Sequence, residues 1–137
     1  MAALAFVLGA IQPIDPALSA EPQPFEGKWI VDIVCADAPD GARGYKWLFT
    51  AQVQDGALLG QYHKPGTVPS GTLSGKIQPD GDALLSMTGL TGNPNASVGQ
   101  VDRGTPFHYT ATAHFDGDHG TGKRNESRVC TLNFLKS

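Results

Sequence analysis

Apolar and polar residues alternate through most of the chain from residue 29 onward. Trp29, Val31, Ile33 and Cys35 occupy every second position of the first such segment. The pattern is clearest over residues 45–54, where aromatic and other apolar side chains take the odd positions and mostly polar ones the even positions. A period of two residues is that of a β-strand with one buried face. Both segments are therefore predicted to be strands.

Turn residues separate the alternating segments. Asp55-Gly56 supplies the left-handed backbone that a tight hairpin needs, and Pro79-Asp80-Gly81 and Asp116-Gly117 have the same character. The pattern predicts no helix of any length. The remaining predicted strands are a return strand with Leu58, Gly60 and Tyr62, segments 73–77, 83–87 and 107–115, a final segment from Thr121 to Phe134, and a short strand at 97–101 inside the longest loop, residues 89–104.

Seven or eight short strands joined by hairpin turns predict an all-β fold. We expect a single antiparallel up-and-down β-barrel of about eight strands, with a β-sandwich as the alternative. Cys35 falls late in the first strand and Cys130 early in the last apolar stretch. If these two strands are antiparallel neighbours, the cysteines face each other. Closure would also remove the unpaired edges of an open sheet.

The chain length allows one domain, and the N-terminal composition indicates export. The sequence has 137 residues, with 17 glycines, 10 prolines and 17% charged residues. Residues 2–11 are almost wholly apolar, too short a stretch to span a bilayer, and small residues follow at 17–20. This order predicts a signal peptide at 1–20, a tail at 21–25 and a barrel domain at 26–137. No Lys or Arg precedes the apolar run, so a disordered or docked tail is the alternative.

The two cysteines support the same compartment. In a small exported chain an even number of cysteines indicates a bridge, whereas a cytosolic protein keeps its thiols reduced. We therefore predict a Cys35–Cys130 disulfide in a periplasmic or secreted protein. Because the loop it closes is nearly the length of the domain, the chain-entropy model gives a stabilisation of about 4–5 kcal/mol.

Short motifs carry two resemblances. Gly27-Lys28-Trp29 resembles the G-x-W motif of calycins, although the lipocalin T-D-x-Y motif and most avidin tryptophans are missing. That resemblance implies a Trp at the closed barrel end, under Lys136 or Arg128. A longer ordered set resembles a poorly characterised family of small exported bacterial domains, which implies fold and compartment but no mechanism. Its parts are Phe25-x-Gly27-x-Trp29 with Cys35, Gly44-Tyr45-x-Trp47-x-Phe49, Gly56-x-Leu58-x-Gly60-x-Tyr62, Ser74-Gly75-x-Ile77-x-Pro79-Asp80-Gly81, Gly89-Leu90-Thr91-Gly92, Gly104-Thr105-Pro106-Phe107-x-Tyr109, Gly120-x-Gly122-x-Arg124 and Arg128-x-Cys130-x-Leu132-x-Phe134-x-Lys136.

Aromatic residues are the candidate ligand contacts. The interior of an eight-stranded barrel is either filled by side chains or holds one small ligand. Tyr45, Trp47, Tyr62 and Tyr109 each offer flat apolar area and a polar handle, and the alternative is that they form the core. Arg103 and the loop at 91–104 would form a rim at the barrel mouth, where loops commonly carry binding.

Charge and histidine spacing argue against several other functions. The net charge of −3 disfavours a nucleic-acid partner, which would need a basic surface. His108 and His114 share a strand face but lie about 20 Å apart along it, too far to bind one ion. His114 and His119 with Asp116 and Asp118 have the composition of a solvated hairpin tip. We predict no metal and no cofactor.

Catalytic patterns are equally weak. Glu126 lies beside Lys123, Arg124 and Arg128, which we interpret as a surface charge ladder. No G-x-S-x-G motif occurs, and bridged cysteines leave no thiol nucleophile. We therefore predict no enzyme activity. The leading hypothesis is an exported binding module that holds a small apolar or amphipathic ligand, and the alternative is a protein-interaction module or inhibitor of an exported hydrolase.

Overall fold

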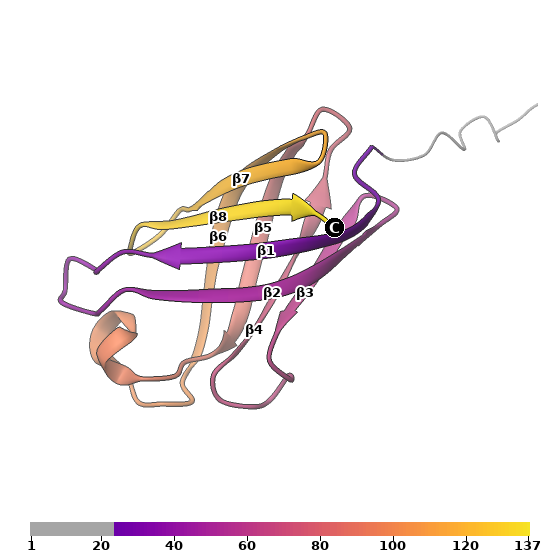
Figure 1. Cartoon of the computed structure of the whole chain (residues 1–137). Helices are drawn as coiled ribbons and strands as arrows, with labels where there is room; N and C mark the ends of the chain where they lie inside the picture. Colours follow the sequence, from indigo (N-terminus) through magenta and orange to yellow (C-terminus); the bar gives the residue numbers. More distant parts are fainter. Residues whose placement is uncertain (1–23) are drawn as a thin grey trace, which may run out of the picture.

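Eight antiparallel strands form a closed barrel in the computed structural model, which describes residues 24–137 (Figure 1). Each strand pairs with the next along the chain and the last pairs with the first, so the predicted up-and-down barrel is confirmed and the sandwich is not. No helix among these residues is long and apolar enough to cross a membrane. The strands are β1 Gly27–Cys35, β2 Tyr45–Gln54, β3 Ala57–Tyr62, β4 Ser70–Ile77, β5 Asp82–Leu90, β6 Pro106–Asp116, β7 His119–Arg124 and β8 Cys130–Lys136.

The barrel closes where β1 meets β8. The register runs from Trp29 opposite Lys136 to Cys35 opposite Cys130, and the two cysteines form the predicted disulfide. Both are buried, and the described residues contain no free cysteine. The predicted signal peptide at 1–20 lies outside the described residues.

Two sequence expectations for local structure were wrong. Residues 97–101 form no strand, because two short 3₁₀ turns, η2 (Pro94–Ala96) and η3 (Val98–Gln100), occupy that part of the loop. The Asn93 side chain accepts a hydrogen bond from the backbone N–H of Asn95 at the start of η2, and Gly99 has a left-handed φ of 77°, which an extended strand excludes. The final apolar segment is also two strands, β7 and β8, separated by residues 125–129.

One end of the barrel is sealed by packed side chains. Trp29 is fully buried, and its ring packs edge-on against Phe115 with centroids 5.3 Å apart. The Trp29 indole N–H donates to the carbonyl of Phe25, which also packs on Phe115. Lys136, not Arg128, is the basic residue near Trp29, with its Nζ 5.9 Å from the ring centroid. We call this end the closed end.

Tight turns join the strands at the closed end. Asp55 and Gly56, both at positive φ, make the β2–β3 turn, as the sequence predicts. The Glu26 carboxylate accepts hydrogen bonds from both of their backbone N–H groups, at 2.7 and 2.9 Å. The chain just before β1 is thereby fixed across this end.

The opposite end, which we call the open end, carries the long connections. These are residues 36–44, 63–69, 91–105 and 125–129, and Figure 1 shows the two helical turns at the end toward which β1 runs. The disulfide also lies there, at the end of β1 and the start of β8.

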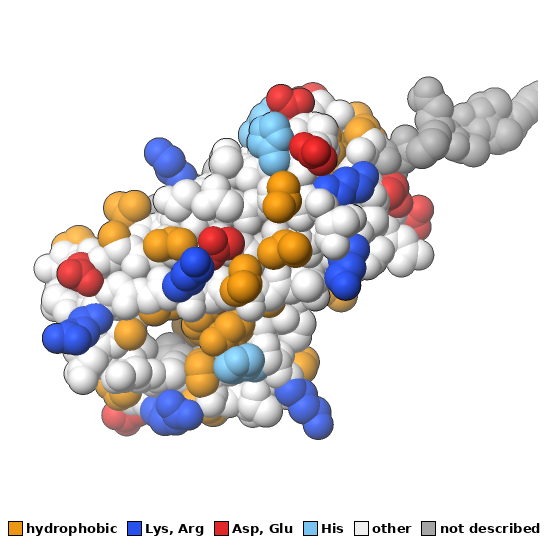
Figure 2. Space-filling model, in the orientation of Figure 1, with side chains coloured by type: hydrophobic (Ala, Val, Ile, Leu, Met, Phe, Trp, Pro, Cys, Tyr) orange, Lys and Arg blue, Asp and Glu red, His pale blue; other side chains and the backbone are white. Residues whose placement is uncertain are grey.

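The outer surface of β8, β1 and β2 carries several apolar side chains. Ile30 and Leu135 are exposed and lie opposite each other in the register. Leu48 is exposed opposite Asp32, which forms an ion pair with Lys46 at 3.7 Å. Figure 2 shows apolar side chains on this face with single charged ones among them. The alternation therefore leaves some apolar groups outside the core.

Candidate functional site: a pocket at the open end

A pocket of about 330 Å³ lies at the open end, between the strand ends and the 91–105 loop. Its wall combines aromatic and other apolar side chains with two arginines. The main lining residues are Tyr45, Trp47, Phe107, Val98, Arg124 and Arg128. Pockets of this size at barrel mouths are typical small-molecule sites.

Trp47 is the centre of the aromatic wall. It points inward from β2 and stacks on Tyr62, with ring centroids 4.1 Å apart and planes 7° apart. Tyr45 and Phe107 lie 5.5 and 6.2 Å from it. The indole fits because position 71 on β4 is glycine: a Cβ there would lie 2.6 Å from a Trp47 ring atom. The aromatic wall is therefore a packed cluster. One side of it contacts the barrel interior and the other side lines the pocket.

Arg124 is the last inward-facing residue of β7. Gly120 and Gly122 precede it on the same face and are buried. The row of inward-facing residues on β7 therefore ends with a positively charged side chain. Its guanidinium carbon lies 4.1 Å from the centroid of the Tyr109 ring, a cation–π arrangement. Its Nε donates to the carbonyl of Glu126 at 2.7 Å. Burial lowers the pKa of Arg124.

Arg128 holds the mouth together. It is only 5% exposed and donates to three backbone carbonyls, those of Ala36, Arg43 and Ala96, at 2.6 to 2.9 Å. Its guanidinium therefore ties the 36–44 loop and η2 to the 125–129 loop. Its Nε is buried without a partner among the described residues. The guanidinium also lies 5.2 Å from the Tyr45 ring centroid.

The surface charge ladder expected around Glu126 was wrong. Arg128 is buried, Arg124 is half-buried and faces the pocket, and the Glu126 carboxylate accepts hydrogen bonds from Thr110 instead. Those bonds lower the pKa of Glu126. In residues 24–137 the ion pairs within 4.0 Å are Asp32–Lys46, Asp82–His114 and Asp118–His119, so neither pocket arginine pairs with a carboxylate.

The 91–105 loop is fastened across the mouth. The backbone N–H of Arg43 donates to the Asn95 carbonyl at 2.7 Å, and that of Gly99 donates to the Asp40 carboxylate at 2.7 Å. This second bond is the main reason that the pKa of Asp40 lies below its usual value. Arg103 donates to the Val68 carbonyl at 2.9 Å on another loop. Val98 lines the pocket from the underside of the loop.

The structure separates the residues named as candidate ligand contacts. Tyr45 and Trp47 line the pocket directly. Tyr62 lies behind Trp47, and Tyr109 is 2% exposed beneath Arg124. Arg103 fastens the loop and does not line the pocket.

The pocket residues that were missed include an aromatic residue and both cations, namely Phe107, Arg124 and Arg128. The alternation of Gly120, Gly122 and Arg124 was a usable signal, because it puts Arg124 on the inward face. Arg128 lies beyond the end of the strand, so alternation says nothing of its direction.

The pKa values of two tyrosines at the open end are raised. Burial raises the pKa of Tyr109, which faces the interior with 2% exposure. Burial also raises the pKa of Tyr45, while the charges of Arg124 and Arg128 act in the opposite direction.

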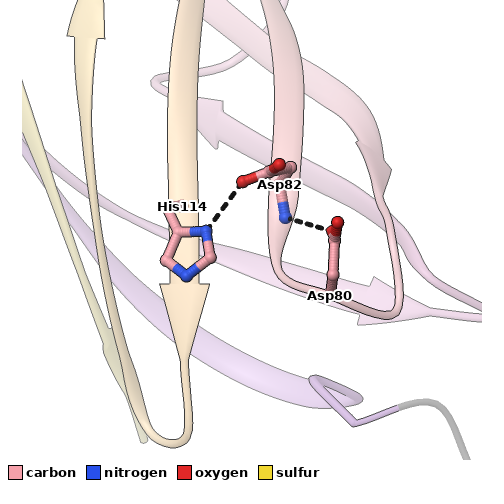
Figure 3. Close-up of polar contacts among 3 residues, drawn as sticks. All are labelled: Asp80, Asp82 and His114. Carbon is pink, nitrogen blue, oxygen red and sulfur yellow. Dashed lines mark hydrogen bonds and ion pairs between the residues drawn. The ribbon is translucent and has the colours of Figure 1, made fainter.

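The histidines take no part in the pocket. His114 lies opposite Asp82 in the β5–β6 register, and its Nδ1 is 2.8 Å from the Asp82 carboxylate (Figure 3). Asp80 accepts from the Asp82 backbone N–H at 2.9 Å, which closes the hairpin turn. Within the described part of the chain, no group of three or more His, Cys, Asp or Glu side chains is arranged to hold a metal ion.

Comparisons with protein-family models, with curated proteins and with solved structures found no match to this chain.

Proposed function

We propose that this protein is a non-enzymatic binding module that holds a small apolar or amphipathic ligand at the open end of its barrel. The observation that carries this proposal is the 330 Å³ pocket walled by Tyr45, Trp47 and Phe107 beneath a fastened loop. Concave sites with an apolar wall and a few polar groups are the usual form of small-molecule sites. Trp29 and its neighbours fill the closed end of the barrel, so the ligand would bind at the open end.

The side chains of the pocket support binding rather than catalysis. Among the described residues that line it there is no carboxylate, imidazole or thiol. These groups most often act as general acid, general base or nucleophile. The cations that are present, Arg124 and Arg128, are guanidinium groups, which offer hydrogen-bond donors and no acceptor.

Export to the periplasm or the cell exterior is part of the same proposal. The Cys35–Cys130 disulfide supports it, because such bridges persist in oxidising compartments. The calycin-like features, namely G-x-W and the basic Lys136 near Trp29, support it less directly. Mass spectrometry of material from the native host tests export: we expect a mature N-terminus between Ser19 and Pro22. An intact residue 1 on exported protein would contradict a cleaved signal peptide.

The alternative, an interaction module or inhibitor acting through a loop, has less support. It would be favoured by a filled barrel with a protruding apolar loop. The apolar side chains Val98 and Val101 of the longest loop instead line the pocket.

Tryptophan fluorescence tests the pocket. The chain has two tryptophans, Trp29 at the closed end and Trp47 in the pocket wall. A Trp29→Phe variant leaves Trp47 as the only reporter, and we expect a panel of small apolar and amphipathic molecules to include ligands that quench it saturably. The matched Trp47→Phe variant retains only Trp29 and should show no such signal. Equal quenching of both variants would mean nonspecific association, and quenching of neither would contradict the proposal.

A further inference from the structure

The two arginines of the pocket indicate the chemical class of the ligand more narrowly than the apolar wall of the pocket does. We propose that the ligand is an apolar carboxylate and that the guanidinium of Arg124 binds its carboxylate group. This inference rests on the proposed binding function and adds the chemical class of the ligand and the residue that recognises it.

The donors of Arg124 are only partly used. Its Nε donates to the Glu126 carbonyl, and the structure gives its two terminal nitrogens no hydrogen-bond partner within residues 24–137. Those nitrogens are also accessible at the surface, since the only arginine atom of these residues that is buried without a partner is the Nε of Arg128, and Arg124 is one of the residues that line the pocket. Two parallel N–H groups of a guanidinium match the two oxygens of a carboxylate. Arg124 therefore offers a bidentate site to an anion in the pocket.

The positive charge of the two arginines is only weakly offset within the described chain, where Glu126 acts on Arg124 without forming an ion pair with it. Arg124 and Arg128 both line the pocket, and no carboxylate of that part of the chain lies within 4.0 Å of either. The two terminal nitrogens of Arg128 donate to three carbonyls, which leaves only its buried Nε without a partner. Arg124 has one carbonyl, bonded to its Nε, and an aromatic ring, so both of its terminal nitrogens remain available. A cation in a partly desolvated, apolar setting favours an incoming anion, because the protein has already met part of the desolvation cost. An uncharged ligand can still accept hydrogen bonds from a guanidinium, but it would gain less than an anion from this arrangement.

The tyrosines around the cations complete the polarity of the site. Tyr109 lies under Arg124 and Tyr45 faces Arg128, at ring-centroid distances of 4.1 and 5.2 Å. Both phenols are neutral at physiological pH, as an unperturbed tyrosine already is, and burial raises their pKa values further. The rings thus hold the guanidinium groups in place without cancelling their charge.

The remaining surface of the pocket sets the body of the ligand. Trp47, Phe107, Val98 and Val101 offer apolar contact and no further charge. A volume of about 330 Å³ equals that of roughly eleven water molecules at ~30 Å³ each, so the pocket has room only for a small ligand. One charged end and an apolar body of this size describe a medium-chain fatty acid or an aryl-alkanoic acid. A phosphate ester would present a larger, more highly charged head to a single free guanidinium fork.

Octanoate and octanamide are the probes that test this. They have the same length and shape and differ in charge. We expect calorimetric titration of the unmodified protein with its disulfide intact to give octanoate an affinity about ten- to hundredfold higher, the range of a charge-assisted hydrogen-bond pair. In Arg124→Gln the two probes should bind alike, at the affinity of octanamide for the unmodified protein.

Lys123→Gln is the matched control. Lys123 precedes Arg124 on β7 but points outward and is exposed, so this variant removes the same charge without touching the pocket. It should keep the full preference for octanoate. If Arg124→Gln does not fold, Arg124→Lys keeps the charge but loses the planar fork, and we expect the preference to fall severalfold.

The outcomes separate the inference from the function on which it rests. If both probes bind equally to the unmodified protein, the carboxylate inference fails and the binding function stands. If neither binds while the fluorescence panel finds uncharged ligands, the inference also fails alone. If neither probe nor any panel member binds, both fail. An undiminished preference for octanoate in Arg124→Gln, or in Arg124→Lys if Arg124→Gln does not fold, would assign recognition to another group and overturn the role of Arg124.

Discussion

Trp29 and Trp47 mark two ends of one barrel that use the same alternation for different purposes. At the closed end Trp29 is fully buried among Phe25, Phe115 and the chain before β1, and short turns leave no room above it. At the open end Trp47 is half-buried, stacks on Tyr62 and borders a pocket under a long loop. An inward-facing aromatic residue therefore becomes core or site according to the length of the connections beyond it.

The two ends are also held together differently. Packing and the Glu26 hydrogen bonds secure the closed end. The disulfide, Arg128 and the loop contacts secure the open end, where the strands splay into long connections. The open end thus relies on specific cross-links in place of a dense core, which leaves space for a ligand.

The largest expected effect comes from the disulfide. Cys35→Ala/Cys130→Ala should lower the free energy of unfolding by about 4–5 kcal/mol, because the bridge restricts a loop with a sequence separation of 95 in the unfolded chain. Urea unfolding followed by circular dichroism measures this. The oxidised parent is the reference, and the reduced parent should match the variant. A loss below about 1 kcal/mol would mean that packing alone closes the barrel.

Truncating the tryptophans should separate the ends. Trp29→Ala removes a fully buried side chain and should cost about 3–5 kcal/mol of unfolding free energy. Trp47→Ala should cost clearly less, since its side chain is partly exposed, while it should abolish ligand quenching. Equal losses in stability, measured by the same urea unfolding, would show that the open end is core.

Added methyl groups sharpen the same contrast. In Gly120→Ala the new Cβ would lie 2.7 Å from the Phe115 ring, and in Gly71→Ala it would lie 2.6 Å from the Trp47 ring. Overpacking of this kind costs roughly 1–3 kcal/mol. We expect Gly120→Ala at the upper end of that range, because Phe115 is enclosed. The stability loss in Gly71→Ala should be smaller, because Trp47 can shift into the pocket. That shift should lower the affinity of this variant for its ligand, and an unchanged affinity would contradict this placement of Trp47.

Alkaline pH should lower the free energy of unfolding through two tyrosines of the open end, Tyr45 and Tyr109. The folded-state pKa values of Tyr45 and Tyr109 are raised above their unfolded value near 10. The contribution of these two neutral phenols to the free energy of unfolding is therefore complete below about pH 10. It is lost as the pH rises above 10 toward the folded values. Urea unfolding between pH 8 and 11 should show stability falling above pH 10. The Tyr45→Phe/Tyr109→Phe variant should lose most of that fall, and an equal fall in this variant would point to other groups.

Much of the fold followed from the alternation, while the site followed only in part. The inward faces of β1 and β2 and the pairing of Cys35 with Cys130 were predictable because a two-residue period has one physical meaning in a closed sheet. The conformation of residues 97–101 was not predicted. Val98 and Val101 are three residues apart, which suits the 3₁₀ turn at Val98–Gln100 better than a strand, and the left-handed φ of Gly99 is set by the folded loop.

The pocket depends on what lies between strands. Whether Arg128 points outward or into the mouth is decided by the carbonyls of Ala36, Arg43 and Ala96, which only the folded loops bring together. Likewise Tyr62 and Trp47 both face the barrel interior. Only their ring stacking in the folded structure shows that Trp47 lies between Tyr62 and the pocket. Periodicity assigns a face to such residues but not a neighbour.

The most direct test of the two-ended account is a proton–nitrogen NMR titration of the unmodified protein with octanoate. The two indole N–H signals, from Trp29 and Trp47, report the two ends in one spectrum. We expect the Trp47 signal and the backbone amides of 91–105 to shift progressively with octanoate, while the Trp29 signal, bonded to the Phe25 carbonyl, stays in place. A shift of the Trp29 signal as large as that of Trp47 would contradict a pocket confined to the open end, and no shift of either would contradict the binding of a carboxylate there.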